Sequence, residues 1–340
     1  MTRSPSMVAF AALLLAGTPM EYGGRGAEDV SRPGVPSAIE ERRAVAEDVT
    51  VTILSSNLAN GNTVGEWGLS ALIEVDGACV LFDAGRHPET VVHNAEVLGA
   101  DLSCVTDLVL SHHHADHTTG VLPILEALGD RSSLARVHVA RGFFRPRRVP
   151  MRSEVDEANQ MIQQRLEFEA AGLDVRVHDG PVEILPGVWV TGSVPRPNDE
   201  RNYPNQIRIE ESGEWVADWV PESQGLTIVT DEGHIVLLGC GHSGVVNMLS
   251  HVQSAIDDRP IHALMGGLHL FNATDETLGW TTDRLRDIGV EHLMAGHCTG
   301  IEPLFRLRTG LNLNRRTAVV GAVGSQFVLG EGIRATAIAM

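Results

Sequence analysis

Residues 111–120 gather four of the chain's 15 histidines and one aspartate within ten positions, Ser-His-His-His-Ala-Asp-His-Thr-Thr-Gly. Imidazole nitrogens and carboxylate oxygens bind Zn²⁺ at about 2.0–2.2 Å, and a catalytic zinc site keeps one position open for water or substrate. His112 and His114, two apart on extended backbone, point the same way and can share one ion. Asp116 and His117 come from the following bend and can reach a second ion. The segment therefore predicts a metal site.

Two later loops each carry a histidine directly after an apolar strand. His242 follows the apolar stretch 235–238 in Gly-Cys-Gly-His-Ser-Gly, and His297 follows 293–295 in Gly-His-Cys-Thr-Gly. We predict His242 as the third ligand of the first ion and His297 as the residue that closes the second coordination sphere. His113 faces the opposite way between two ligands and is not predicted to bind.

The elements around these loops indicate an α/β fold with one large catalytic domain. The apolar stretch 108–110 is typical of a buried parallel strand, and 121–128 of the helix that follows it. Ligands in such folds collect beyond the carboxyl ends of the strands. Further strands are predicted at 51–54, 69–75, 79–82, 137–139, 175–177, 188–191, 226–229 and 235–238, and helices at 91–98, 154–171, 245–256 and 274–288.

In order along the chain, these motifs resemble the metal motifs of the metallo-β-lactamase superfamily. The resemblance implies a four-layer αββα sandwich with the metals at one edge, and one or two Zn²⁺ per chain, with Mn²⁺ or Fe²⁺ also compatible. It also implies that Asp116 ligates and orients the nucleophile. Asp83, in Leu-Phe-Asp-Ala-Gly, is similar to the superfamily's aspartate that holds a metal-binding loop.

Other motifs narrow the resemblance to one branch of the superfamily. Glu66-Trp67-Gly68, the Gly-Cys-Gly-His and Gly-Gly-Leu-His loops, and His-Cys-Thr-Gly are similar to the branch named for 7,8-dihydropterin-6-methyl-4-(β-D-ribofuranosyl)aminobenzene-5'-phosphate synthase. That branch implies a metal-assisted transfer that forms a carbon–nitrogen bond with loss of diphosphate. A related metallo-hydrolase is the alternative reaction. A metal-dependent binding or sensing protein without turnover is the alternative outside enzymes.

The chain departs from this pattern at two places. Most two-metal members of the superfamily have a bridging aspartate after a strand that corresponds to 263–265, but here Gly-Gly-Leu-His follows that strand. Either His269 takes that place as a metal or substrate ligand, or the second ion is weakly held, or the site uses one ion. The second departure is Glu-Ser-Gln-Gly at 222–225, where the branch usually has an acidic pair before its glutamine; this change could alter substrate contacts.

A cluster of arginines within 141–152 is the main candidate for substrate binding. If this segment folds over the metals, guanidinium groups could clamp a phosphate or carboxylate, and the neighbouring phenylalanines could cover a flat ring. The alternative is a solvated loop. The predicted substrate-binding residues are Arg145, Arg147, Arg148, Arg196 and Glu66.

Charge and length limit the classes of partner. The 340 residues carry a formal net charge of −18, which disfavours a nucleic-acid partner, because such binding needs clustered Lys and Arg. We expect a small-molecule substrate, phosphorylated or aromatic, and no integral membrane span; the oligomeric state is not indicated. The catalytic domain is predicted at 49–335, with an inserted Arg-rich helical cap at about 141–225.

The amino-terminal segment differs from the rest of the chain. Arg3 precedes an apolar stretch at 7–17 that is too short to span a bilayer but suits an export signal. We predict a signal peptide at 1–20 and a flexible linker at 21–48, hence a periplasmic or exported protein; a cytoplasmic protein with an unstructured tail is the alternative.

The four cysteines do not decide the compartment, because all four could stay reduced. Two of them, Cys240 and Cys298, lie in the metal loops. We expect these two to pack behind the ligands rather than to bind metal.

Overall fold

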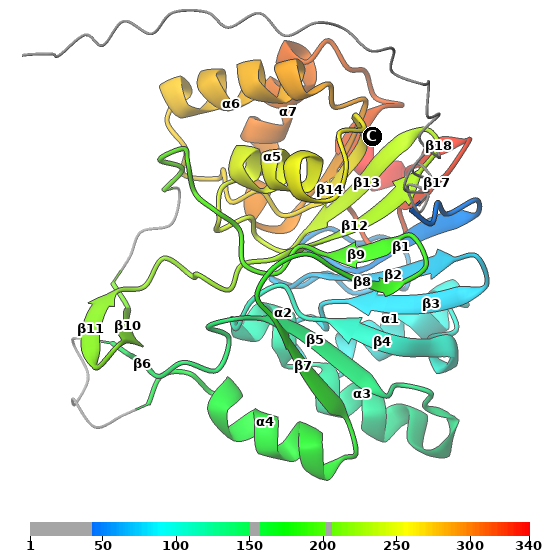
Figure 1. The fold of residues 1–340 in the computed structure, drawn as a ribbon. Coiled ribbons are helices and arrows are strands. Elements are labelled where there is room, and N and C mark those ends of the chain that lie inside the picture. The colour runs from blue at the N-terminus through cyan, green and yellow to red at the C-terminus, as the bar shows by residue number, and fades with distance from the viewer. Residues whose placement is uncertain (1–42, 150–156, 202–205) are drawn as a thin grey trace, which may run out of the picture. The chain divides into compact units, whose positions relative to one another are not determined.

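The computed structural model describes residues 43–149, 157–201 and 206–340, which form two β-sheets packed face to face with helices on the outer faces (Figure 1). The predicted α/β four-layer αββα sandwich is confirmed. The predicted signal peptide at 1–20 and most of the linker lie outside the described residues. The linker's predicted end is wrong, because Ala46 is buried and its amide donates to Val229 O at 2.8 Å.

The first sheet has eight strands in the order β18-β17-β1-β2-β3-β4-β5-β7. Pairing is antiparallel from β18 to β3 and parallel from β3 to β7. The strands are β1 (Val49–Ser55), β2 (Ser70–Val75), β3 (Ala78–Phe82), β4 (Val105–Val109), β5 (Arg136–Ala140), β7 (Asp174–His178), β17 (Gln326–Val328) and β18 (Gly332–Arg334).

The second sheet has seven strands in the order β16-β15-β14-β13-β12-β9-β8. Its half from β13 to β16 is parallel, and its half from β8 to β13 is antiparallel. The strands are β8 (Val182–Leu185), β9 (Val188–Val190), β12 (Gly225–Thr230), β13 (Gly233–Leu238), β14 (Ile261–Gly266), β15 (His292–Ala295) and β16 (Ala318–Val320).

Three apolar clusters correspond to the three interfaces between the four layers. The cluster between the sheets includes Val51, Phe82 and Ile235. A second cluster joins the second sheet to α5 (Val245–Ala255), α6 (Asp275–Ile288) and α7 (Ile301–Gly310). A third joins the first sheet to α1 (Thr90–Leu98), α3 (Val121–Leu128) and α4 (Met161–Ala170). No helix within the described ranges is long and apolar enough to cross a membrane.

The hairpin between β2 and β3 shows how local sequence sets the register of the first sheet. Asp76 and Gly77 both have positive φ, of 48° and 81°, which a two-residue hairpin turn of this kind requires. The Asp76 carboxylate also accepts hydrogen bonds from the amides of Glu47 and Asp48. The turn therefore positions β3, whose end carries Asp83.

The predicted helical cap at 141–225 is wrong in its make-up. Helix α4 packs on β7 in the outer layer, and β7, β8 and β9 belong to the two main sheets. What projects from the sandwich is a three-stranded sheet, β11-β10-β6, formed by β6 (Arg147–Arg148), β10 (Arg208–Glu211) and β11 (Glu214–Ala217) (Figure 1). We call this sheet with its connecting residues 141–149 and 206–224 the lobe.

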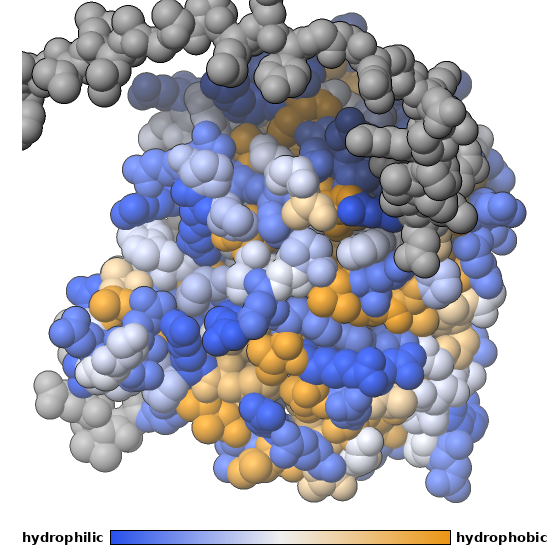
Figure 2. Space-filling model, viewed as in Figure 1, coloured by the Kyte–Doolittle hydropathy of each residue, from blue (hydrophilic) through white to orange (hydrophobic). Residues whose placement is uncertain are grey.

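One face of the molecule carries an edge strand of each main sheet. β7 and β8 are edge strands of the first and second sheet. Figure 2 shows apolar surface over α4, β7 and β8, where Leu166, Val177 and Val182 are exposed.

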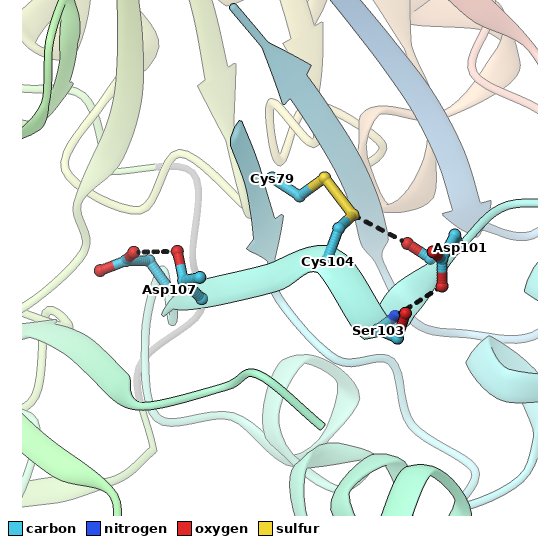
Figure 3. Close-up of a disulfide and its surroundings, with 6 residues drawn as sticks. Cys79, Asp101, Ser103, Cys104 and Asp107 are labelled. Carbon is cyan, nitrogen blue, oxygen red and sulfur yellow. Dashed lines mark hydrogen bonds between the residues drawn. A yellow bond between two sulfur atoms is a disulfide. The ribbon is translucent and has the colours of Figure 1, made fainter. Parts of the chain in front are cut away.

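A disulfide joins Cys79 of β3 to Cys104, just before β4 (Figure 3). The sequence did not decide whether these cysteines pair. Cys240 and Cys298 are free and buried. The bond closes a loop with a sequence separation of 25 residues, and so restricts the unfolded chain.

We expect the paired variant Cys79→Ser with Cys104→Ser to lose about 3 kcal/mol of unfolding free energy in urea denaturation, because the loop is no longer closed when the chain unfolds. The check on the bond itself is thiol counting. Denatured protein should expose two reactive thiols before reduction and four after it. Four thiols without reductant would contradict the pairing.

Candidate metal centre

The predicted ligands lie at the carboxyl ends of parallel strands from both sheets. His112 and His114 follow β4, and Asp116 and His117 belong to the short helix α2 (Ala115–Thr118). His242 follows β13, and His297 follows β15 in the 3-10 turn His297–Thr299. Because β4 and the strands β13 to β15 end at one edge of the sandwich, segments up to 185 residues apart in sequence meet there.

The first predicted triad comes together as one cluster. The ligand atoms of His112, His114 and His242 all lie within 4.8 Å of one another. His112 Nε2 and His114 Nδ1 are 3.0 Å apart. Donor atoms on one tetrahedral zinc ion, each about 2.0–2.1 Å from it, lie about 3.3 Å apart. The three imidazoles therefore fit one metal ion.

The second predicted triad also comes together. The ligand atoms of Asp116, His117 and His297 lie within 4.8 Å of one another. Asp116 Oδ2 is 3.3 Å from His297 Nε2 and 3.8 Å from His117 Nε2. His297 is 4% exposed, and its Nδ1 makes no hydrogen bond. A buried imidazole that lies beside a carboxylate is a suitable donor for a metal ion. The three side chains therefore fit a second ion.

Asp83 orients one histidine of each triad. His117 Nδ1 lies 2.6 Å from Asp83 Oδ2, and Ser111 Oγ donates to the same oxygen at 2.7 Å. Ser111 Oγ in turn lies 2.9 Å from His112 Nδ1. Because Oγ gives its proton to Asp83, it accepts the proton of His112 Nδ1. Both imidazoles therefore direct Nε2 toward other predicted ligands, His114 and Asp116, as the role predicted for Asp83 requires.

This arrangement predicts the effect of Asp83→Asn. Asp83 accepts hydrogen bonds on both carboxylate oxygens, from the Ser111 amide on one and from Ser111 Oγ and His117 Nδ1 on the other, so the NH₂ of asparagine would face a donor on either side. Zinc affinity should therefore fall by about 10- to 100-fold, measured by competition with a chromophoric chelator. Asparagine tolerates the positive φ of 56° at this position, so the backbone should be retained. The matched control is Asp76→Asn, also at positive φ, far from the ligands. Equal zinc affinity in the two variants would contradict the orienting role.

The backbone of Gly239 packs closely against the side chains of Ser111 and Asp83. A Cβ on Gly239 would lie 1.9 Å from Ser111 Oγ and 2.9 Å from Asp83 Oδ2. No side chain fits between the end of β13 and the serine. The glycine before Cys240 thus lets the two metal loops, one from each sheet, come together.

Electrostatics prepares the histidines of the first triad for metal binding. Burial, together with the neighbouring imidazoles, lowers the pKa of His112, His114 and His242 well below the usual value. Neutral imidazole is the form that binds a metal ion. These three residues can therefore bind a metal ion at neutral pH without first losing a proton.

The second triad is charged differently. Burial acts to raise the pKa of Asp116, but His117 and His297 outweigh it and hold that pKa below its usual range. Burial likewise acts to lower the pKa of His117, but Asp83 and Asp116 outweigh it and raise the pKa to about 9. An ion that binds at His117 Nε2 must therefore displace a proton, so binding at this triad releases protons.

The two triads open onto one pocket of about 390 Å³. Its walls combine ligand atoms with apolar side chains, Trp67, Ile207 and Phe271. Trp67 and Phe271 pack edge to face, with ring centroids 5.9 Å apart. His269 also lines the pocket, and its ligand atom lies within 4.8 Å of those of His242 and Cys240. The structure thus places His269 beside the predicted ligand His242, which is compatible with the sequence alternative that His269 binds metal or substrate.

The predicted arginine clamp is corrected by the structure. Arg147 is 1% exposed and pairs with Asp218 and Glu222 at 2.7 Å each, so it cannot reach a substrate. Arg145 pairs with Glu211, and Arg148 stacks on Trp215, both on the lobe. None of the three is among the described residues that line the metal pocket.

Arg196 and Glu66 also have other tasks than the predicted substrate binding. Arg196 donates to the carbonyls of Trp219 and Val220, and borders a separate cavity. Glu66 accepts hydrogen bonds from Ser55 Oγ and from the amides that follow Gly85, those of Arg86 and His87. Glu66 therefore holds the loop that carries its neighbour Trp67 to the pocket.

The apolar wall of the pocket is what sequence reasoning missed. Trp67 stands inside the Glu-Trp-Gly motif, and Phe271 comes two residues after His269, so both were adjacent to recognised signals. Ile207 comes from the lobe and had no signal, because its sequence neighbours are polar.

Comparison with known proteins agrees with this geometry. The sequence pattern of the metallo-beta-lactamase superfamily matches residues 68–246, more than half of the chain. The chain belongs to this superfamily. The pattern covers the aspartate loop, the His-rich segment and the His242 loop.

Individual relatives place the chain within the superfamily. A 7,8-dihydropterin-6-methyl-4-(beta-D-ribofuranosyl)-aminobenzene-5'-phosphate synthase of Methanocaldococcus jannaschii is 27% identical over 267 residues, which are 75% of this chain and 89% of that protein. The crystal structure of a metal-dependent hydrolase of the beta-lactamase superfamily aligns with a TM-score of 0.64 at 24% identity, over 78% of this chain and 94% of that one. The metallo-beta-lactamase fold protein YhfI of Bacillus subtilis aligns with a TM-score of 0.52 at 12% identity, over 83% and 100% of the two chains. These two structures support the fold alone.

Proposed function

We propose that this protein is a dinuclear, zinc-dependent hydrolase of a small molecule that carries a flat or apolar group. The observation that carries the proposal is that both triads open onto one pocket whose remaining wall is aromatic and aliphatic. Superfamily membership supports metal dependence. Manganese or iron would fit the same donor atoms, because metal supply and geometry choose among these ions.

The protein's own residues divide the work as follows. Five imidazoles and one carboxylate would hold the ions, which when bound supply Lewis acidity and lower the pKa of water. The Asp116 side chain is 13% exposed, so its carboxylate can accept a hydrogen bond from a water in the pocket and orient that water. Asp83 and Ser111 keep the imidazoles of His112 and His117 in place while the oriented water attacks the substrate.

The walls of the pocket indicate the substrate class. Trp67 and Phe271 are 47% and 41% exposed, and they present aromatic surface next to the ligands. Of the described residues that line the pocket, none is Lys or Arg. An anionic group of the substrate would therefore be held by the ions themselves, while the rest of the substrate packs on the two rings.

Transfer is the second candidate reaction, and the similarity to the synthase of Methanocaldococcus jannaschii favours it. In that reaction an arylamine would take the place of water and diphosphate would leave. The aromatic wall would suit an arylamine as well as a hydrolase substrate. The lack of a described cationic side chain in the pocket is the reason we place hydrolysis first.

The test uses the full protein, purified without added metal, then loaded with Zn²⁺ or stripped by a chelator. We expect about two ions per chain, and metal-dependent cleavage of at least one substrate from a panel of aryl phosphodiesters, aryl esters and lactones. Diphosphate release from 5-phosphoribosyl diphosphate, with and without an arylamine, tests transfer. Two bound ions with no turnover on either arm would instead support a binding or sensing protein. Fewer than one bound ion would overturn the metal centre.

We also propose that the protein works outside the cytoplasm. The Cys79–Cys104 disulfide supports export, because disulfides persist in oxidising compartments. Alkylation of thiols in intact cells, followed by mass spectrometry, tests it. Alkylated Cys79 and Cys104 in the native protein would contradict export.

A further inference from the structure

We propose that Cys240 binds metal through its Sγ, as a ligand of the ion held by Asp116, His117 and His297. The inference rests on the metal centre of the proposed function and adds a donor to it. It answers the departure seen in the sequence, where no carboxylate follows β14. It also replaces our sequence-based expectation that this cysteine packs behind the ligands.

The first argument is the position of the sulfur atom. Cys240 Sγ lies 3.2 Å from His117 Nε2. With a zinc–sulfur bond of about 2.3 Å and a zinc–nitrogen bond of about 2.0–2.1 Å, two such donors on one tetrahedral ion lie about 3.6 Å apart. A small rotation of the cysteine side chain covers the difference. Cys240 is also among the residues that line the metal pocket, as is Cys298.

The second argument is that this sulfur lies among donors of both triads. The ligand atoms of Cys240, His112 and His117 are within 4.8 Å of one another, and these two histidines belong to different triads. The same sulfur groups with His297 on one side and with His242 on the other. The sulfur would thus add a donor to the second triad, which lacks the superfamily's aspartate.

The third argument is the hydrogen bonding of His117. Asp83 receives the Nδ1 proton, so Nε2 is the atom that faces both the sulfur and the ion. An ion at Nε2 would displace the proton that this nitrogen carries, so Nε2 would no longer make a hydrogen bond with the sulfur. The S–H bond then breaks, the proton leaves to water through the pocket, and a sulfur–metal bond forms without any change of oxidation state. Metal binding by cysteine releases a proton in this way.

Cys298 provides the matched comparison. It is equally buried, it lies in the neighbouring metal loop, and its Sγ points toward the carbonyl oxygen of Cys240 at 3.9 Å. Its sulfur groups with Cys240 and His297, whereas Cys240 Sγ also lies 3.2 Å from His117 Nε2 and groups with His112 and His117. We therefore assign ligation to Cys240 and packing to Cys298.

The experiment loads metal-stripped protein with Co²⁺ under a phosphine reductant and records its absorption spectrum. A cobalt–thiolate bond gives an intense near-ultraviolet charge-transfer band, whereas imidazole and carboxylate ligands give only the weaker visible bands. We expect the intense band in the unmodified protein and in Cys298→Ser, and its loss in Cys240→Ser. Zn²⁺ affinity at the site of Asp116, His117 and His297 should fall by at least about 10-fold in Cys240→Ser alone.

The outcomes separate this inference from the proposed function. Visible cobalt bands without the charge-transfer band in the unmodified protein would overturn the cysteine ligand and leave the metal centre standing. Loss of the intense band in Cys298→Ser with retention in Cys240→Ser would overturn the assignment between the two cysteines. No cobalt spectrum at all in the unmodified protein would overturn the metal centre itself. The spectrum of the unmodified protein requires no variant, so the first outcome can be tested even if Cys240→Ser fails to fold.

Discussion

Asp116→Asn is expected to lower kcat/KM on any substrate of this protein by on the order of 10³-fold, while the variant stays folded. Loss of a group that merely supports a metal ligand costs about 10- to 100-fold, and Asp116 is predicted to be both a ligand and the group that orients the nucleophile. Asparagine keeps the shape of the side chain, and the carbonyl of residue 116 still accepts from the Leu69 amide. Kinetics and metal analysis on the same preparation measure the effect.

The metal content of this variant distinguishes ligation from a purely chemical role. Since the first triad does not include Asp116, we expect one ion to be retained by His112, His114 and His242. The matched control is Asp130→Asn, which removes the same charge from an exposed position shortly after α3 and should change neither turnover nor metal content. Unchanged turnover in Asp116→Asn would reject the catalytic role of this carboxylate.

The metal loops could be predicted because their signals are local. Each predicted metal loop begins just after an apolar stretch, and chain direction in a parallel sheet brings such loops to one edge. Strand predictions succeeded for the same reason, for example at β3 and β13, where apolar runs end in loop residues. The sandwich itself came from the resemblance to the superfamily, not from periodicity.

The lobe could not be predicted, because its determinants are not local. The sequence shows Arg147 within a cluster of arginines, which favours a solvated or anion-binding loop. Its two carboxylate partners, Asp218 and Glu222, come 71 and 75 residues later. No local sequence pattern predicts that Arg147 pairs with carboxylates so far away in the chain. Similarly, Cys240 lies beside His117 only because the loop after β13 meets α2, which the sequence around it does not show.

A buried polar network ties the lobe to the His-rich loop, and it carries the prediction with the largest effect on stability. Arg147 donates to Asp218 Oδ2 and to Glu222 Oε2, and also to three backbone carbonyls at 3.2–3.4 Å. Glu222 Oε1 lies 2.6 Å from Nδ1 of His113, which sits between two predicted ligands. The acidic residue that remains in the segment 222–225, where the branch usually has an acidic pair, is thus part of this network.

Arg147→Met should lower the unfolding free energy by about 3–5 kcal/mol, because it leaves two carboxylates buried without their cation. For a domain of this size that corresponds to a fall in Tm of about 10 °C. The matched control is Arg145→Met, two residues earlier. The Arg145–Glu211 pair is 36% and 44% exposed, so its loss should cost no more than about 1 kcal/mol.

The pH dependence identifies the network as the cause. Burial acts to raise the pKa of Glu222, but Arg147 and His113 outweigh it and lower the pKa to about 2. In the unmodified protein, Glu222 therefore contributes stability that is present above its unfolded pKa of about 4.5 and is lost as the pH falls toward 2. Without Arg147 the pKa of the buried carboxyl rises above the unfolded value, so the sign reverses and the variant loses stability as pH rises. Urea denaturation at pH values of about 5 and 8 should show a larger deficit at the higher value; an equal deficit would mean that lost packing, not uncompensated charge, destabilises the variant.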